Sequence, residues 1–290
     1  MKYIFISGGV ISGIGKGIAS ASICLLLKSA GYKVAPIKCD PYLNVDAGTM
    51  NPIIHGETFV MDDGSETDQD LGHYERFFGE SLNKTNYTTS GQVYLSVIQR
   101  ERNLDYNGEC VEAVPHIPEE FLKRIQEAGR SKNADIVVAE IGGTVGELQN
   151  VFIFEANRML KHKRPGDVIH IHLSYLPIPP SIGEMKSKPA QMSVKELNSM
   201  GIHPDILLAR SSEAIDDSRR KKLSLFCDLE PEDIISAPDV SNVYEVPINL
   251  DKEGLTERIL KKLKLRRRKR ALAPWKKFVK SAITVKKPIK

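Results

Sequence analysis

The stretch Ser7-Gly8-Gly9-Val10-Ile11-Ser12-Gly13-Ile14-Gly15-Lys16-Gly17 decides the fold of this chain. It follows the apolar run Tyr3 to Ile6 and precedes a run with helical spacing, which is where a phosphate-binding loop stands. Glycines let several backbone N–H groups point into one hollow, and the helix N-terminus and Lys16 add positive charge. A glycine-rich turn with a surface lysine is the alternative for the glycines alone. With a strand before and a helix after, the sequence predicts a site for a nucleoside triphosphate.

The loop departs from the usual pattern G-x-x-x-x-G-K-[ST] at two positions. Counting back from Gly15 puts Val10 where the first glycine normally stands. Gly17 replaces the hydroxyl residue that normally contacts magnesium. A metal ion must therefore be held by residues outside the loop.

The segments around the loop predict an α/β fold. A helix is expected over Gly17 to Ala30, with Gly31 as its left-handed end, and a strand over Lys33 to Lys38. This strand, loop, helix, strand order is typical of a mostly parallel sheet with helices on both faces. Lys38 should face the same phosphates as Lys16, because ligands bind at the carboxyl ends of parallel strands. With 290 residues, 41% of them hydrophobic, the chain can bury the core of one large domain.

Charge and apolar patterning exclude several classes of partner. Residues 261–290 hold 14 of the 41 basic residues and no acid, so residues 1–260 carry 27 basic against 37 acidic side chains, a formal charge of −10. An acidic body does not suit nucleic acid, and we interpret the basic end as a solvated linker rather than a nucleic-acid or membrane contact. No run has the length of a membrane span and no export signal is evident, so we expect a cytoplasmic protein. The four cysteines lack metal-ligand spacing and are expected in or near the core.

Carboxylates at strand ends are the candidates for a metal site. Asp135 to Glu140 has the pattern of a buried strand and is followed by the glycine-rich run Ile141 to Gly146, which makes Glu140 a candidate Mg²⁺ ligand. A strand-end acid that caps the next helix is the alternative. A second carboxylate is expected from the acidic stretch Asp62 to Asp70, in which composition does not choose a member. Of the histidines, we expect one of His170 and His172 near the core, and His73 is a candidate for the site.

Taken together, seven segments resemble the synthetase half of CTP synthase, in order and at comparable spacing. They are SGGVISGIGKG (7–17), KCDPYLNVDAGTMNP (38–52), HGETFVMDDGSETDQDLGHYERF (55–77), EIGGTVGE (140–147), KSKPAQMSVKEL (186–197), HPDILLARS (203–211) and LFCDLEPEDIISAPDVSNVYEVP (225–247). The resemblance covers roughly residues 1 to 265. It implies a P-loop-type, dethiobiotin-synthetase-like synthetase domain at 1–265 and a basic linker at 266–290.

The resemblance also implies a reaction. The γ-phosphate of ATP would pass to O4 of UTP, and ammonia would then displace that phosphate to give CTP. Mg²⁺ and ATP are the implied cofactor and cosubstrate, and catalysis would rest on positioning and positive charge from Lys16 and Lys38. CTP is implied as a feedback inhibitor, and the family implies a homotetramer with the pyrimidine nucleotide between subunits.

Site residues carry over by position. The implied ATP contacts are Gly13, Ile14, Gly15, Lys16, Gly17, Ile18, Asp70, Pro238, Asp239 and Val240. The implied UTP or CTP contacts are Ser12, Glu147, Leu148, Gln149, Lys186, Ser187, Lys188, Pro189, Ala190, Gln191 and Lys222. Asp70 and Glu140 match the two metal ligands of the family. Without the resemblance, the Lys-x-Lys-Pro run at 186–189 is more typical of a solvated turn.

The chain departs from the family pattern on the pyrimidine side and at its end. Where the family usually reads GGTVGDIE, this chain has Glu147 and Gln149 in place of the two acids. Where the family usually reads KTKPTQ, Ser187 and Ala190 replace the threonines, and Glu112 lies where the family tends to show glutamine. These changes are expected to affect pyrimidine affinity and CTP inhibition. The glutaminase domain of the family would begin near Val285 to Lys290, and none of the cysteines has its nucleophile setting, so we expect use of ammonia and not of glutamine.

Two alternatives to a CTP synthase stay open. One is another P-loop amidoligase or ATPase, such as a dethiobiotin-synthetase-like or partition-type protein. The other is a non-catalytic assembly or regulatory protein that binds nucleotide without turnover. Product analysis with ATP, UTP and ammonium separates them, since CTP forms only under the first interpretation.

Overall fold

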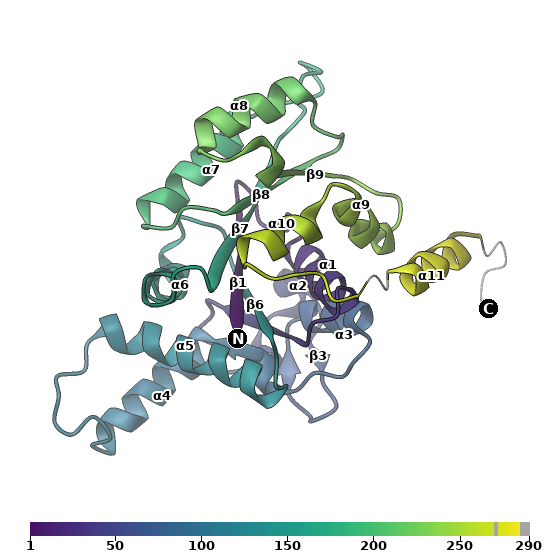
Figure 1. Cartoon of the computed structure of the whole chain (residues 1–290). Helices are drawn as coiled ribbons and strands as arrows, with labels where there is room; N and C mark the ends of the chain where they lie inside the picture. The colour runs from purple at the N-terminus through teal and green to yellow at the C-terminus, as the bar shows by residue number, and fades with distance from the viewer. Residues whose placement is uncertain (270–271, 285–290) are drawn as a thin grey trace.

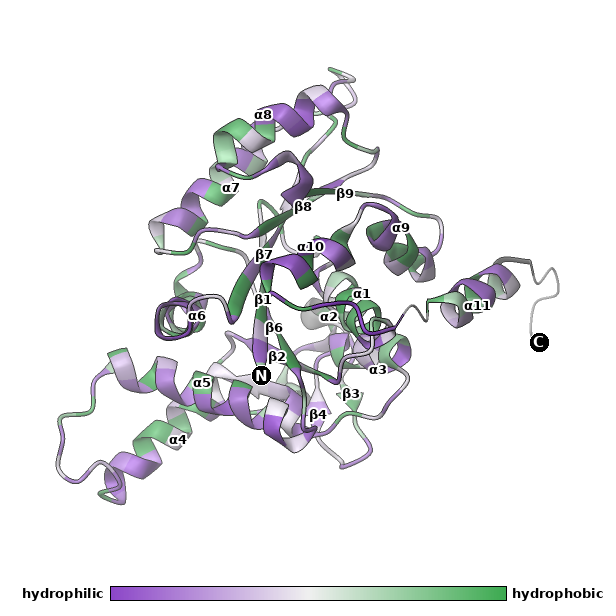
Figure 2. Ribbon diagram, in the orientation of Figure 1, coloured by the Kyte–Doolittle hydropathy of each residue, from purple (hydrophilic) through white to green (hydrophobic). Residues whose placement is uncertain are grey.

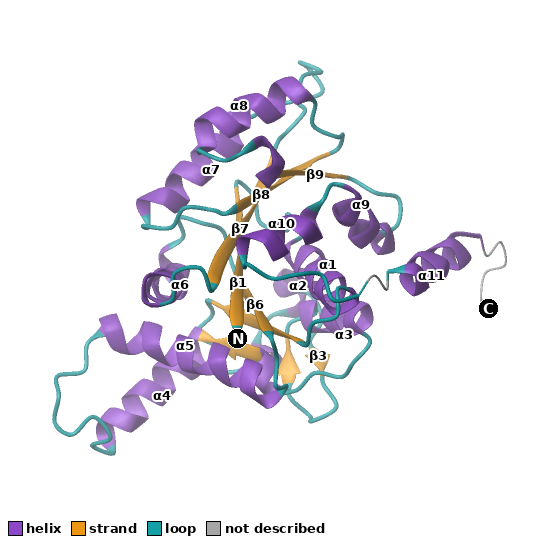
Figure 3. Ribbon diagram, in the orientation of Figure 1, coloured by secondary structure: helices purple, strands orange, loops and turns teal. Residues whose placement is uncertain are grey.

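A computed structural model describes residues 1–269 and 272–284 of the chain (Figure 1). Within these residues, a central sheet has the strand order β5-β2-β6-β1-β7-β8-β9 and is parallel at every pairing. The strands are β1 (Lys2–Gly9), β2 (Val34–Asp40), β5 (Tyr87–Thr89), β6 (Ile136–Ile141), β7 (Val168–Tyr175), β8 (Ile206–Ser211) and β9 (Ile234–Pro238). A separate antiparallel pair joins β3 (Phe59–Val60) and β4 (Glu66–Thr67). Figure 3 shows the central sheet between layers of helices.

Helices cover both faces of this sheet, which confirms the predicted α/β fold. One face packs against α1 (Lys16–Ser29), α3 (Asp70–Phe78), α9 (Val246–Lys252) and α10 (Leu255–Lys262). The other face packs against α4 (Ser90–Arg102), α5 (Ala113–Ser131), α6 (Val151–Lys163), α7 (Lys188–Ser199) and α8 (Asp217–Cys227). The short α2 (Pro52–His55) and the C-terminal α11 (Ala273–Thr284) complete the α-helices of the described residues. Short 3-10 turns include η5 (Val243–Glu245).

Strand β1 shows why the central strands read as continuous apolar runs. Ile4 and Ile6 point into the core under α1, whereas Tyr3 and Phe5 point into the core under α5 and α6. Because both faces are covered, successive residues are buried with little alternation of polarity. Figure 2 shows the same in α1, which is hydrophobic along most of its surface. A helix buried all round and a strand buried on both faces fix the position of the loop between them.

Element boundaries agree with the predictions at α1 and differ at β2. Gly31 has a φ of +96°, so it is the left-handed residue expected after α1. Strand β2 continues to Asp40, two residues past the predicted end at Lys38. Lys38 therefore lies inside the strand and is buried.

Some expectations about polar and basic residues are wrong. Cys24, Cys39 and Cys227 are buried as expected, but Cys110 is exposed in the loop between α4 and α5. Both His170 and His172 are buried, not one of them. The reason is that strand residues two apart share a face, and this face is covered.

The basic segment after residue 260 is not a freely solvated run where the structure describes it. Arg267 pairs with Asp251 (3.3 Å) and Glu257 (2.8 Å). Arg268 pairs with Asp135 (3.0 Å) and lies over the Tyr32 ring. Acidic groups of the body thus hold part of this segment, which corrects the interpretation as solvated. Residues 285–290, at the expected start of a further domain, lie outside the described residues. In the described ranges, no helix is long and apolar enough to cross a membrane.

Candidate active site

The phosphate loop lies between β1 and α1, as predicted. Gly13 and Gly15 have φ of +68° and +95°, a conformation that glycine adopts without strain. Val10 has a φ of +77°, which is costly for a β-branched residue and is typical of strain kept at functional sites. The Gly8 carbonyl accepts from Val145 N (2.8 Å), and Lys16 Nζ donates to the Gly143 carbonyl (2.7 Å). The loop after β6 therefore fixes one side of the phosphate loop.

The missing hydroxyl at position 17 has a structural reason. A Cβ placed on Gly17 would lie 2.6 Å from Asp70 Cγ and closer still to its Oδ1. The Asp70 carboxylate, at the start of α3, thus fills the space that a Ser or Thr side chain takes in the usual pattern. The lack of a side chain at position 17 therefore leaves room for the Asp70 carboxylate from α3.

Lys38 is buried among carboxylates from three segments. Its Nζ pairs with Asp70 and lies 3.3 Å from Glu140 Oε1, 3.8 Å from Asp40 Oδ1 and 3.8 Å from Asp68 Oδ2. Burial opposes the charge of Lys38, but these acids outweigh burial, so its pKa stays well above the usual value. Burial raises the pKa of Asp40 to about 7, although Lys38 opposes that rise. Burial also lowers the pKa of Lys16, with Glu140 opposing.

The two predicted metal ligands meet at this cluster. Glu140 Oε2 accepts a hydrogen bond from the phenol Oη–H of Tyr74, whereas Glu140 Oε1 has no hydrogen bond within the described residues. Asp70 and Glu140 both contact Lys38, so they lie on one side of the loop. Carboxylates outnumber lysines here, and oxygen is the donor that Mg²⁺ prefers. The residues present therefore fit a magnesium ion. No group of three metal-ligating side chains forms among the described residues, so other oxygens must complete its shell.

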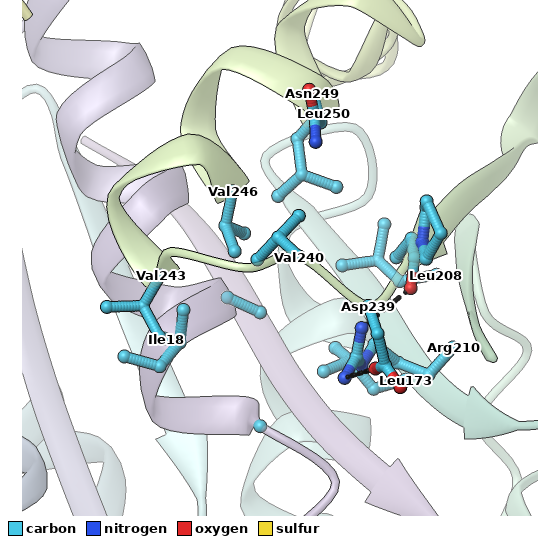
Figure 4. Close-up of a pocket in the computed structure, with 14 residues that line it drawn as sticks. Ile18, Leu173, Leu208, Arg210, Asp239, Val240, Val243, Val246, Asn249 and Leu250 are labelled. Atoms are coloured by element: carbon cyan, nitrogen blue, oxygen red, sulfur yellow. Dashed lines mark hydrogen bonds and ion pairs between the residues drawn. The ribbon is translucent and has the colours of Figure 1, made fainter. Parts of the chain in front are cut away.

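A mostly apolar cavity of about 340 Å³ opens beside the loop (Figure 4). Its walls come from the loop and α1, the end of β9, and α9, and are formed by residues that include Gly15, Ile18, Pro238, Asp239, Val240, Val243, Val246 and Leu250. Arg210 crosses one edge, where it donates to Ile14 O (3.2 Å), Ala237 O (2.7 Å) and Asp239 Oδ1 (2.8 Å). The structure thus brings the predicted adenine-side residues next to the phosphate loop.

Residues predicted for the pyrimidine nucleotide lie on four segments of the chain. Glu147 Oε1 accepts from Thr144 N (2.8 Å), Gln149 donates to Glu147 (2.9 Å), and Leu148 is 90% exposed. At α7, Lys188 is exposed and Lys186 pairs with Glu184 (2.7 Å).

The inward-facing residues of segment 186–191 lie in the protein interior. Ser187, Ala190 and Gln191 are buried, and Gln191 donates to Ser187 (3.1 Å). Ala190 packs in the core beside β8, so the change from threonine there alters packing rather than a surface. Lys222 is exposed on α8, and Ser12 is exposed on the phosphate loop.

Several residues of the site escaped the sequence predictions. They are Arg210, Asp40, Tyr74 and the cavity residues of η5 and α9, whereas Asp68 lies in the acidic stretch from which one member was expected. Arg210 and Asp40 carried a usable signal, because each lies at the carboxyl end of a buried strand, where parallel sheets bind ligands. The others follow only from tertiary contacts.

Known proteins with similar sequences point to one family. The family model described as the N-terminus of CTP synthase matches residues 2–265. The CTP synthases of Methanocaldococcus jannaschii and Pyrococcus furiosus are 51% and 50% identical over 281 and 279 residues, which is 96% of this chain and 52% of each relative. That of Nostoc punctiforme is 47% identical over 287 residues, 98% of this chain and 52% of the relative.

This chain and the proteins it resembles differ in how much of each is matched. The chain spans about half the length of the curated relatives it matches. Among solved structures, the signal recognition particle receptor FtsY from Elizabethkingia anophelis has a TM-score of 0.38 at 13% identity, over 72% of this chain and 49% of that one, and carries no weight for the site. The match over residues 2–265 confirms the resemblance, and the chain belongs to the CTP synthase N-terminal family.

Proposed function

We propose that this chain aminates UTP to CTP, with ATP as phosphate donor and ammonia as nitrogen donor. The observation that carries the proposal is the seating of Asp70 in the space left by Gly17, beside buried Glu140 and Lys38. This places acids and lysines against a phosphate loop, as transfer of a phosphoryl group between two nucleotides requires. Residues 1–265 would form the synthetase domain and 266–290 a linker.

ATP would bind across the loop and the neighbouring cavity. The adenine would enter the apolar cavity between Ile18 and Val240, against backbone groups of the Pro238–Val240 turn. The backbone N–H groups of Gly13 to Ile18, at the start of α1, would hold the phosphates. Lys16 would exchange the Gly143 carbonyl for a phosphate oxygen, a stronger partner because it is charged.

UTP would bind with O4 facing the γ-phosphate of ATP. Its triphosphate would be held by the exposed Lys188 and Lys222 and by the half-buried Lys186, and its base side by Ser12 and the Glu147–Gln149 turn. O4 forms a bond to the γ-phosphorus as the bond to ADP breaks, and the uracil N3 proton is released. Ammonia then bonds to C4 and loses one proton, and phosphate leaves with O4 and the electron pair of the C4–O bond. A phosphorylated oxygen leaves readily, whereas a carbonyl oxygen does not.

The lysines and acids of the site have separate roles in this scheme. Lys16 and Lys38 would stabilise negative charge that develops on the moving phosphoryl group. Asp70 and Glu140 would hold Mg²⁺, which when bound neutralises charge on the phosphates. Glu140 Oε1 is suited to this, since it is buried and makes no hydrogen bond in the described part of the chain.

The test is chromatographic detection of CTP and ADP from ATP, UTP, Mg²⁺ and an ammonium salt. We expect both products in equal amounts, and loss of both in Asp70→Asn and Lys16→Ala with the fold retained. ADP without CTP would favour another amidoligase or ATPase. Tight UTP binding without turnover would favour a non-catalytic nucleotide-binding protein.

The family also suggests partners for this chain. We propose a homotetramer, with CTP as a competitive feedback inhibitor at the pyrimidine site. Light scattering with and without nucleotides measures the assembly. A monomer at all nucleotide concentrations would exclude the tetramer for this chain.

A further inference from the structure

A row of hydrogen-bonded buried side chains runs beneath the phosphate loop. We call it the histidine–serine chain: Asn157, His170, Ser7, His172 and Ser193, from α6, β7, β1, β7 and α7. Asn157 Nδ2 lies 2.5 Å from His170 Nδ1, and His170 Nε2 lies 2.7 Å from Ser7 Oγ. Ser7 Oγ lies 2.8 Å from His172 Nδ1, and His172 Nε2 lies 2.5 Å from Ser193 Oγ. Each of these side chains is buried in an otherwise apolar layer.

The donors and acceptors of the histidine–serine chain all find partners when both imidazoles are neutral. Asn157 Nδ2 can only donate, so His170 Nδ1 accepts and His170 Nε2 donates to Ser7. The Ser7 hydroxyl then donates to His172 Nδ1, and His172 Nε2–H donates to Ser193. Burial agrees with this, since it lowers the pKa of His172 to about 3 and that of His170 well below its usual range.

One end of the histidine–serine chain touches the backbone of the phosphate loop. A Cβ on Gly9 would lie 2.8 Å from Ser193 Cβ and 2.9 Å from His172 Nε2, so loop and helix approach as closely as glycine allows. Ser193 is on α7, whose first turn, Lys188 to Gln191, belongs to the proposed pyrimidine side. His172 thus hydrogen-bonds α7 at the place where that helix meets the loop.

We infer that His172 is a positioning residue, which through Ser193 fixes the first turn of α7 against the phosphate loop and so aligns the pyrimidine nucleotide with ATP. This inference rests on the proposed function. A general packing role would not depend on one hydrogen bond. Here the alignment depends on the hydrogen bond between His172 and Ser193.

Two amide substitutions at position 172 test the two nitrogen atoms of the imidazole one at a time. The amide of Asn reaches the place of Nδ1, so His172→Asn keeps the contact to Ser7 and loses the contact to Ser193. The longer His172→Gln reaches the place of Nε2 and keeps the contact to Ser193. Ser193→Ala removes the acceptor alone. Ser174→Ala is the matched control, since Ser174 is buried on β7 and its Oγ has no hydrogen-bond partner in the described ranges.

The experiment uses the whole chain and measures ammonia-dependent CTP formation together with calorimetric binding of ATP and UTP. We expect kcat/KM for UTP to fall by about tenfold in His172→Asn and Ser193→Ala, the effect of one buried hydrogen bond. The ATP dissociation constant should stay within about twofold in both, and His172→Gln should retain UTP use closer to wild type than His172→Asn does.

Three results would overturn the inference. If the wild type forms CTP and both variants match Ser174→Ala, the inference fails and the proposed function stands. If His172→Asn and Ser193→Ala weaken the binding of ATP and of UTP equally, His172 has only a structural role. The same holds if His172→Gln uses UTP no better than His172→Asn does. If the wild type neither binds UTP nor forms CTP, the proposed function fails and the inference fails with it.

Discussion

Restoring the usual hydroxyl to the phosphate loop, Gly17→Ser, should impair this protein rather than improve it. The new Cβ would lie 2.6 Å from Asp70 Cγ, whereas carbon atoms pack at about 3.5 Å, so the carboxylate must move by about 1 Å. A move of this size changes the geometry of the ion pair between Asp70 and Lys38. Losing one charge-assisted hydrogen bond costs about 1.5–3 kcal/mol, which is about 10- to 150-fold in rate.

The assay is the initial rate of CTP formation over a range of Mg²⁺ concentrations, with thermal unfolding as a check on the fold. We expect kcat/KM to fall within that range and the Mg²⁺ requirement to rise. Gly17→Ala adds the same Cβ without a hydroxyl. It should lower kcat/KM as Gly17→Ser does, because both variants displace the Asp70 carboxylate. In Asp70→Asn, which is already impaired, a further Gly17→Ala change should do little, because the two sites act together. Normal turnover by Gly17→Ser at ordinary Mg²⁺ would refute the account of position 17.

Three further predictions concern the surroundings of the site. Arg210→Ala should raise the KM for ATP by about tenfold with kcat nearly unchanged, since Arg210 holds the edge of the cavity proposed for adenine; a kcat loss at constant KM would contradict this. Asp40, with a pKa of about 7 in the folded state, holds its proton more tightly there than when unfolded. The free energy of unfolding should therefore fall as pH rises from about 4 to 7, by at most about 1.4 kcal/mol per pH unit, and urea unfolding of Asp40→Asn should show a flatter profile. Trp275→Ala removes a hydrogen bond to Tyr244 O (2.9 Å) next to cavity residue Val243, so it should weaken calorimetric ATP binding about threefold; unchanged ATP affinity would argue against this link between α11 and the cavity.

The fold could be predicted from the sequence because its signals are local. The apolar run before Ser7, the glycines up to Gly17 and the helical spacing after it lie within one short stretch. Gly31 ended α1 as expected for the same reason. The predicted end of β2 lies two residues before the observed one. A lysine in the sequence indicates the exposed end of a strand, whereas Lys38 is buried inside β2.

The site was less predictable because its members meet only after folding. Asp70 and Gly17 are far apart in the chain, and the acidic stretch from Asp62 offered no local reason to choose Asp70. The resemblance supplied that choice, and the contact at Gly17 supplies its physical reason. The burial of both His170 and His172 was also hidden, since strand periodicity gives a shared face but not what covers that face.

The charge of the cluster explains why a lysine is buried there. Asp40, Asp68, Asp70 and Glu140 would repel one another in a site of low dielectric constant, and Lys38 contacts all of them. Lys38 and the nearby Lys16 do not balance four acids, so the cluster keeps an affinity for a further cation. Phosphates alone would be repelled from such a group of acids. A divalent ion that binds both the phosphates and the carboxylates removes this repulsion. Under the proposed function, metal and nucleotide must therefore bind together. For this reason the Mg²⁺ requirement is the informative measurement for position 17.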